Sequence, residues 1–176
     1  MLATSHLYVF VILLVPASGS SKIRSSFIVF LVTVKLLPFW IATSPRPRLD
    51  LLVNDFTYRA FFDKTVVLFE ADFKRNYLHI EDAADGFRFA INNPKLAGNC
   101  FNLGYSEANL SKRELCAEIK KIIPDFVYLV SEIGTDIDKR NYIVSNEKIE
   151  KAGFKATRSL SQGIEELVSA LPLLKR

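Results

Sequence analysis

The chain has 176 residues, of which 49% are hydrophobic and 24% charged, with 7 glycines, 7 prolines and 2 cysteines. This composition is typical of a globular protein and excludes intrinsic disorder, a collagen-like repeat and a disulfide-rich scaffold. The length predicts one domain rather than a large two-domain enzyme. Cys100 and Cys116 have no further cysteine or histidine at zinc-ligand spacing, so we expect two buried free thiols.

The net charge of +4 is unevenly distributed along the chain. Residues 1–48 contain five basic and no acidic residues, whereas the rest of the chain is close to neutral. No basic stretch is interleaved with aromatic residues, which argues against nucleic acid as a partner. The composition changes at Ser44–Asp50 (SPRPRLD), where two prolines precede the first carboxylate, so we divide the chain into residues 1–43 and residues 44–176.

Residues 1–43 contain two apolar runs. Leu7–Val15 (LYVFVILLV) is followed by small residues and resembles the hydrophobic region of a secretory signal, but no Lys or Arg precedes it. Phe27–Val34 (FIVFLVTV) is too short to span a membrane and is rich in β-branched residues, so we expect a buried strand. Three interpretations stay open for this segment: a leader, a membrane anchor, or sequence foreign to the fold that follows, such as the translation of a wrong reading frame.

Residues 44–176 alternate predicted helices and strands, which indicates an α/β fold with some parallel sheet. Capping boxes begin two helices, at Ser111 and Ser159, and Pro94 prevents another helix from continuing. In the helix at 81–93 we expect Ala83, Ala84, Phe87, Ala90 and Ile91 to face the core, and in the last helix Ile164, Leu167, Val168 and Leu171. In chain order the patterns predict helix 50–63, strands 65–70 and 76–80, helix 81–93, strand 100–104, helix 111–122, strand 125–130, a short helix 146–151 and a C-terminal helix.

A search for catalytic motifs finds none. The glycines are too widely spaced for a G-x-G-x-x-G or Walker A loop, no tyrosine is followed four residues later by lysine, and no G-x-S-x-G is present. His79, Glu81, Asp82 and Asp85 are clustered in sequence, but we favour capping and surface roles over a metal site, with Asp82 as a helix cap.

The stretch Phe73–Ile91 (FKRNYLHIEDAADGFRFAI) resembles the R-[DN]-[FY]-[IV]-H-[IV]-x-D-x-A motif of the NAD-dependent epimerase/dehydratase family, the extended short-chain dehydrogenases that act on nucleotide sugars. Later segments are similar in the same order: CFNLG to a family strand, LSKRELCAEI to the following helix, and DKRNYIVSNEKIEKAGFKATRSLSQGIEELV to the closing run. Upstream, SPRPRLDLLVNDF resembles the stretch after the last Rossmann strand, so the resemblance covers about residues 44–173.

The resemblance implies a set of substrate-binding residues. Arg75 matches the family arginine that contacts the diphosphate of the substrate, and a planar guanidinium fork suits phosphate oxygens. Tyr77 and His79 belong to the same motif. Arg140 in DKRNY is a second candidate anion contact, although the family's usual R-x-G-D pattern is not present, and Asn54 also matches a family position.

In the family, the glycine loop and the catalytic Ser/Thr, Tyr and Lys belong to a Rossmann domain upstream of SPRPRLD, and residues 1–43 carry neither motif. The expected fold class is therefore α/β, the C-terminal substrate-binding part of a Rossmann-type extended short-chain dehydrogenase whose cofactor domain is largely missing. NAD or NADP is implied by the family, but we expect no catalytic, cofactor-binding or metal-binding residue in this chain. Lys148 matches a family position at which we expect a structural role.

The expected function is that of a truncated nucleotide-sugar epimerase/dehydratase-like protein, inactive alone, that binds the diphosphate end of a nucleotide sugar weakly through Arg75. The alternative is a non-catalytic binding or interaction module whose exposed apolar surface recruits another chain, a second copy included. The family implies a cytoplasmic location, whereas Leu7–Val15 leaves secretion or membrane anchoring open.

Overall fold

The structure is a computed structural model that describes residues 7–16, 27–36, 40–41, 48–134 and 140–174. Its helices are α1 (Leu52–Phe62), α2 (Ile80–Asn92), α3 (Lys112–Ile122), α4 (Glu147–Lys151) and α5 (Leu160–Leu174), with short 3-10 turns at Pro94–Leu96 and Ser106–Ala108. Its strands are β1 (Leu7–Pro16), β2 (Phe27–Leu36), β3 (Trp40–Ile41), β4 (Thr65–Phe69), β5 (Lys74–Asn76), β6 (Leu78–His79), β7 (Cys100–Leu103), β8 (Asn109–Ser111) and β9 (Val127–Ser131).

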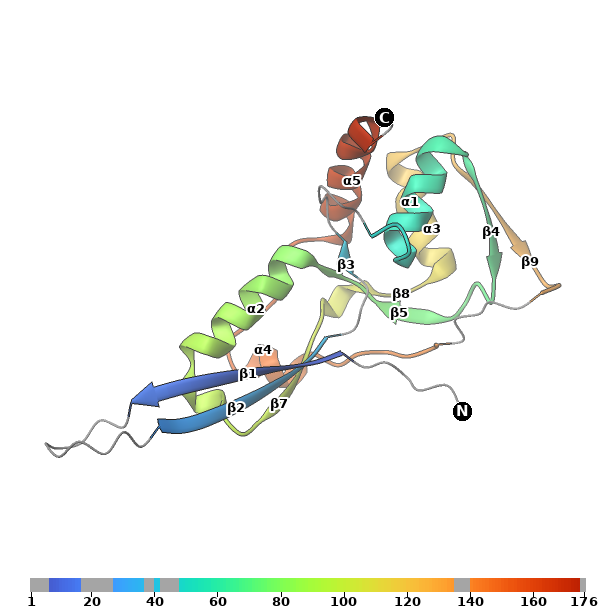
Figure 1. Ribbon diagram of the computed structural model, residues 1–176. Coiled ribbons are helices and arrows are strands. Elements are labelled where there is room, and N and C mark those ends of the chain that lie inside the picture. The colour runs from blue at the N-terminus through green and yellow to red at the C-terminus, as the bar shows by residue number, and fades with distance from the viewer. Residues whose placement is uncertain (1–6, 17–26, 37–39, 42–47, 135–139, 175–176) are drawn as a thin grey trace, which may run out of the picture.

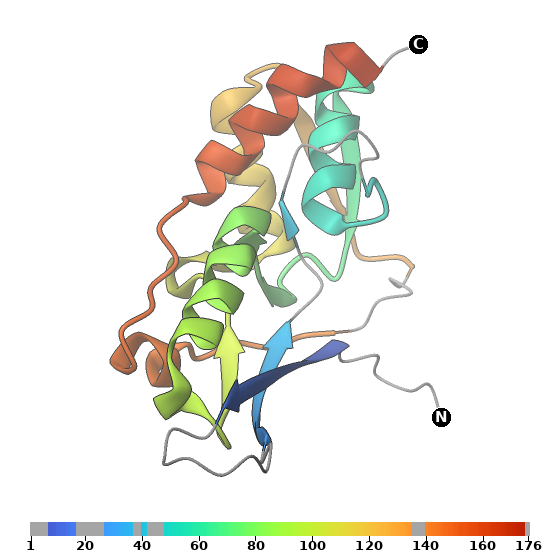
Figure 2. The same cartoon turned by 60° about the vertical axis from the view of Figure 1, so that its left-hand side comes forward.

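The described strands form four small sheets, and three of these contain parallel pairs, which confirms the predicted α/β class. β1 and β2 make an antiparallel hairpin, and the end of β2 runs parallel to β7, from Thr33 opposite Cys100 to Leu36 opposite Leu103. The expected strand at Phe27–Val34 is thus present as β2, and Leu7–Val15 lies in β1. α2 lies along this sheet in both views (Figures 1 and 2).

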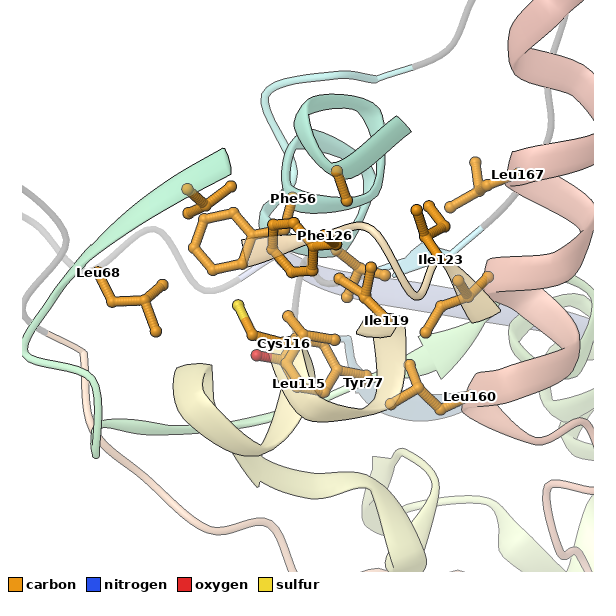
Figure 3. Close-up of a cluster of buried hydrophobic side chains, with 14 of the residues drawn as sticks. Phe56, Leu68, Tyr77, Leu115, Cys116, Ile119, Ile123, Phe126, Leu160 and Leu167 are labelled. Atoms are coloured by element: carbon orange, nitrogen blue, oxygen red, sulfur yellow. The ribbon is translucent and has the colours of Figure 1, made fainter. Parts of the chain in front are cut away.

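The larger hydrophobic core lies between helices α1, α3 and α5 and the inner face of the β4–β9 pair (Figures 1 and 3). The two strands run parallel, with Val66 opposite Tyr128 and Leu68 opposite Val130, and Val66 and Leu68 point into the core. Period-two alternation explains this arrangement, because Thr65 and Val67 then face outward. The core also contains Phe56, Leu115, Ile119, Phe126, Ile164 and Leu167.

A second core joins α2, β7 and α4, and it corrects part of the predicted helix face. Ala83 and Ala90 are buried as expected, but Ala84 is exposed and Ile91 is 42% exposed. Gly86 occupies the central position instead, where an added Cβ would lie 2.6 Å from a methyl of Leu103, so the helix backbone approaches β7 closely. The buried face is therefore rotated from the one expected.

Other predicted boundaries shift by a few residues. The strand expected at 76–80 is divided into β5 and β6, and α2 already begins at Ile80. β9 begins at Val127 rather than Asp125. The prediction of two buried thiols is correct for Cys116 but wrong for Cys100. Exposed and buried side chains alternate along β7, and Cys100 takes an exposed position.

Both predicted capping boxes are present. Ser111 Oγ accepts a hydrogen bond from Glu114 N at 3.2 Å, and a Glu114 carboxylate oxygen accepts one from Ser111 N at 2.7 Å. Gln162 N and Ser159 Oγ are joined at 3.2 Å, and Ser159 N donates to the Gln162 side chain at 2.8 Å. These bonds satisfy amide groups that a helix leaves free in its first turn.

Candidate functional site

Arg75 lies at the centre of the short strand β5, which pairs antiparallel with β8 and places Arg75 opposite Leu110. Its side chain is 1% exposed. One guanidinium nitrogen, Nη1, donates to the carbonyl of Lys74 at 3.0 Å, and the guanidinium carbon lies 5.8 Å from the centre of the Tyr142 ring. The arginine thus lies between a strand and an aromatic side chain, and the π electrons of the Tyr142 ring stabilise the charged guanidinium.

The Arg140–Asn146 segment runs beside β5 near its start. Tyr142 N donates to Lys74 O at 3.1 Å, and Lys74 N donates to the side chain of Asn141 at 2.9 Å. Asn141 and Tyr142, the two residues after Arg140, therefore lie beside the strand that carries Arg75, although they are far from it in sequence. Tyr142, which the sequence analysis did not select, contributes the ring that covers Arg75.

Tyr77 and His79 follow Arg75 directly, but the structure places both inside the protein. Tyr77 is fully buried in the larger core, where its ring lies near Leu115 and Cys116 (Figure 3). His79 is the N-cap of α2: its Nδ1 accepts from Glu81 N at 3.2 Å, and its Nε2 lies 3.1 Å from a carboxylate oxygen of Glu166 in α5. Both ring nitrogens of His79 are thus engaged by the fold itself.

Asp82 is not the helix cap that the sequence predicts, since His79 has that role. The Asp82 carboxylate is buried and accepts hydrogen bonds from Thr157 N at 3.2 Å, Arg158 N at 2.9 Å and Arg158 Nη1 at 2.9 Å. Arg158 also contacts Glu81 at 2.6 Å and Asp85 at 3.0 Å, and its guanidinium holds the pKa of Asp85 below the ordinary value. These carboxylates bind the start of α5 to α2, and within the described part of the chain no cluster of His, Cys, Asp or Glu is arranged as a metal site.

The remaining predicted positions have local partners. Asn54 is buried in α1, and its amide donates to Arg48 O at 3.0 Å. Lys148 donates to Cys100 O at 2.9 Å and lies over the Phe101 ring at 4.7 Å, so it joins α4 to β7 as expected of a structural residue.

An open groove of about 660 Å³ runs along one side of α5. Its polar lining includes Glu165 and Glu166 together with Arg158, whose guanidinium is already bound to three carboxylates. A diphosphate entering this groove would meet more negative than positive charge. This groove is therefore a poor candidate for an anion site.

No protein-family model matches the chain. Solved structures do match it, and one is UDP-glucose 4-epimerase from Thermotoga maritima with UDP-glucose, at a TM-score of 0.64 and 19% identity over 78% of this chain and 44% of that chain. The fold of the present chain is that of part of a Rossmann-type extended short-chain dehydrogenase. UDP-glucose 4-epimerase from Thermus thermophilus in complex with NAD matches at a TM-score of 0.63 and 18% identity, over 80% of this chain and 46% of that chain.

A third match of the extended short-chain dehydrogenase fold is UDP-glucuronic acid 4-epimerase from Bacillus cereus in complex with UDP-glucuronic acid and NAD, with a TM-score of 0.59 and 22% identity over 77% of this chain and 44% of that chain. The chain spans less than half of the length of these enzymes. The predicted fold class is confirmed by these matches, which show a shared architecture at low sequence identity.

Proposed function

We propose that the chain is an epimerase/dehydratase-like protein that retains the substrate side of a nucleotide-sugar enzyme and binds the diphosphate of its ligand through Arg75, with Arg140 as a second contact. The observation that carries the proposal is the place of Arg75 on β5, beside the segment that begins at Arg140, in a fold shared with enzymes solved with UDP-glucose and UDP-glucuronic acid. A guanidinium can bind two phosphate oxygens at once through parallel hydrogen bonds, which a lysine cannot do. Tyr77, His79 and Asn54, with their internal partners, would support this site.

The order of contact follows from burial. Arg140 is partly exposed, whereas Arg75 is covered by the Tyr142 ring. A diphosphate therefore meets Arg140 first and reaches Arg75 when the ring of Tyr142 turns aside. Once enclosed, the ion pair gains strength from the low dielectric constant of the site.

The residues of this chain do not fit a nicotinamide cofactor. A dinucleotide diphosphate is held by a glycine-rich turn at the start of a helix, and the sequence contains no such spacing of glycines and no Tyr-x-x-x-Lys pair for proton transfer. NAD or NADP belongs to the family resemblance only. The proposed activity of this chain alone is binding in the cytoplasm, without turnover.

Calorimetric titration of UDP-glucose into the full chain tests the proposal. We expect Arg75→Lys and Arg140→Ala to weaken binding about tenfold each, the loss of one charge-assisted hydrogen bond. Arg113→Ala is the matched control, because Arg113 is an exposed arginine paired with Asp72 at 3.0 Å and its loss should leave the affinity unchanged. The proposal fails if the unchanged chain does not bind, or if folded Arg75→Lys and Arg140→Ala both bind as tightly as the unchanged chain.

One observation favours a second function, an interaction module. The outer face of the β4–β9 pair exposes apolar side chains: Val67 is 46% exposed, Leu129 lies opposite it at 56%, and Ile133 beyond β9 is 88% exposed. Contiguous exposed apolar surface of this kind is typical of a site for another chain. Size-exclusion chromatography with light scattering distinguishes the two functions, because a stable, monodisperse oligomer favours the module and a monomer that binds UDP-glucose favours the first proposal.

No helix within the described residues is long and apolar enough to cross a membrane.

A further inference from the structure

The Arg140–Asn146 segment has no regular secondary structure, yet side-chain amides hold it in place along its length. At its start, Asn141 accepts from Lys74 N at 2.9 Å. Near its end, Asn102 of β7 donates to Ser145 O at 3.1 Å. Between these two points, Val144 is bound on both of its backbone groups by the side chain of Asn109.

The side chain of Asn109 binds both backbone groups of Val144, as the backbone of a paired β-strand would do. Asn109 Oδ1 accepts from Val144 N at 2.9 Å, and Asn109 Nδ2 donates to Val144 O at 3.0 Å. A carboxamide carries an acceptor oxygen and an NH2 donor in one plane, so it can replace a peptide group of a neighbouring strand, and Asn109 Nδ2 also donates to Ser106 O at 3.2 Å. Two simultaneous bonds fix both the position and the orientation of Val144, whereas one bond would allow rotation.

Asn109 belongs to the same two strands that carry Arg75. It begins β8 and lies opposite Asn76 of β5, one residue after Arg75. The amide clamp therefore ties the covering segment directly to the strand pair that holds the arginine. Because Tyr142 is two residues from Val144, the clamp sets the backbone position from which the Tyr142 ring lies over Arg75 or turns aside.

We propose that Asn109 is a positioning residue of the anion site: it sets the path of the Arg140–Asn146 segment and so places Arg140 and the Tyr142 ring relative to Arg75. The inference rests on the proposed function. Asn109 contacts no ligand in this scheme and acts only through the backbone of Val144. Displacing a binding group by a fraction of an ångström is enough to weaken a charge-assisted hydrogen bond.

The test is a double-mutant cycle on UDP-glucose affinity, measured by calorimetry with the full chain. We expect Asn109→Ala to weaken binding about tenfold, the equivalent of two neutral hydrogen bonds. If Asn109 acts by placing Arg140, the double variant Asn109→Ala with Arg140→Ala binds only as weakly as Arg140→Ala alone. Asn102→Ala is the control, because Asn102 holds the next residue by one exposed bond and should change the affinity by less than about twofold.

The outcomes distinguish the positioning role of Asn109 from the proposed function on which it rests. Affinity of Asn109→Ala equal to that of the unchanged chain, or additive losses in the cycle, overturn the positioning role while leaving the proposed function in place. A purely structural role gives additive losses, because global destabilisation acts independently of Arg140. No binding by the unchanged chain removes the proposed function and this inference with it. Should Asn109→Ala fail to fold, Asn109→Ser, whose hydroxyl can still accept from Val144 N, takes its place in the cycle.

Discussion

Asp82 is the buried member of the three carboxylates that bind α2 to the start of α5, and its removal should have the largest effect. Asp82 is 1% exposed and accepts hydrogen bonds from two consecutive backbone amides, Thr157 N and Arg158 N, in addition to the Arg158 side chain. Asp82→Ala leaves both amides without their acceptor in the turn that precedes α5. Hydrogen bonds to a charged group contribute about 1.5–3 kcal/mol each, and breaking a buried network of this kind costs about 3–5 kcal/mol in total.

Asp85 provides a matched control on the same helix. It contacts the same guanidinium at 3.0 Å, but its side chain is 30% exposed and it binds no backbone amide. Asp85→Ala should therefore leave the free energy of unfolding nearly unchanged, because solvent screens exposed ion pairs. Asp82→Asn, which keeps one acceptor oxygen, should fall between the two variants.

Urea denaturation followed by far-ultraviolet circular dichroism measures the difference. The midpoint for Asp82→Ala should fall well below that of the unchanged chain, with an unchanged dependence on urea concentration. A loss under about 1 kcal/mol for Asp82→Ala, or a loss equal to that of Asp85→Ala, would refute the assignment of Asp82 as the link, since both results lie below the range expected of a buried, charged acceptor.

Three further predictions follow from single side chains. Gly104→Ala should destabilise the fold by about 2–3 kcal/mol in urea denaturation, because the added Cβ would lie 2.1 Å from Asn76 Oδ1; an unchanged midpoint contradicts this close approach. A maleimide at about pH 8 should label exposed Cys100 and spare Cys116, whose pKa burial raises to about 12, and peptide mass spectrometry that finds both thiols modified in the folded chain contradicts it. The hydrogen bond from the backbone of Ser111 lowers the pKa of Glu114, so Glu114 stabilises the fold above its ordinary pKa of 4.5 and loses this effect as pH falls through its lowered value. The loss of unfolding free energy caused by Glu114→Gln should therefore be smaller in acid than at pH 7. Equal losses at the two pH values contradict the prediction.

Local patterns predicted the local structure well. The capping boxes at Ser111 and Ser159 each satisfy amides within one turn, so their partners are three residues away and visible in sequence. The α/β class followed from the alternation of the patterns for the same reason. The position of Arg75 came from resemblance to a family motif, since no periodicity distinguishes one arginine on a short strand from another.

The contacts between residues far apart in sequence were not predictable in this way. Asn109 is joined to Val144 across 35 residues and Asp82 to Arg158 across 76, so no short window of sequence contains both partners. The rotation of the α2 face has a similar cause, because the close approach of Gly86 to Leu103 decides which side of the helix is buried. The strand expected at His79 is present, since His79 ends β6, but its role as the N-cap of α2 depends on the turn that follows it and was not predicted.

The parallel pairing of β4 with β9 has a consequence for biosynthesis. Residues 70–126 separate the two strands, so β4 leaves the ribosome well before its partner has been made. Until then Val66 and Leu68 have no completed core to enter, and the apolar strand is available to chaperones or to other nascent chains. Closing so long a loop is entropically unfavourable, so the α3 helix, which folds locally between the strands, should form first and bring β9 to β4 as the slow step.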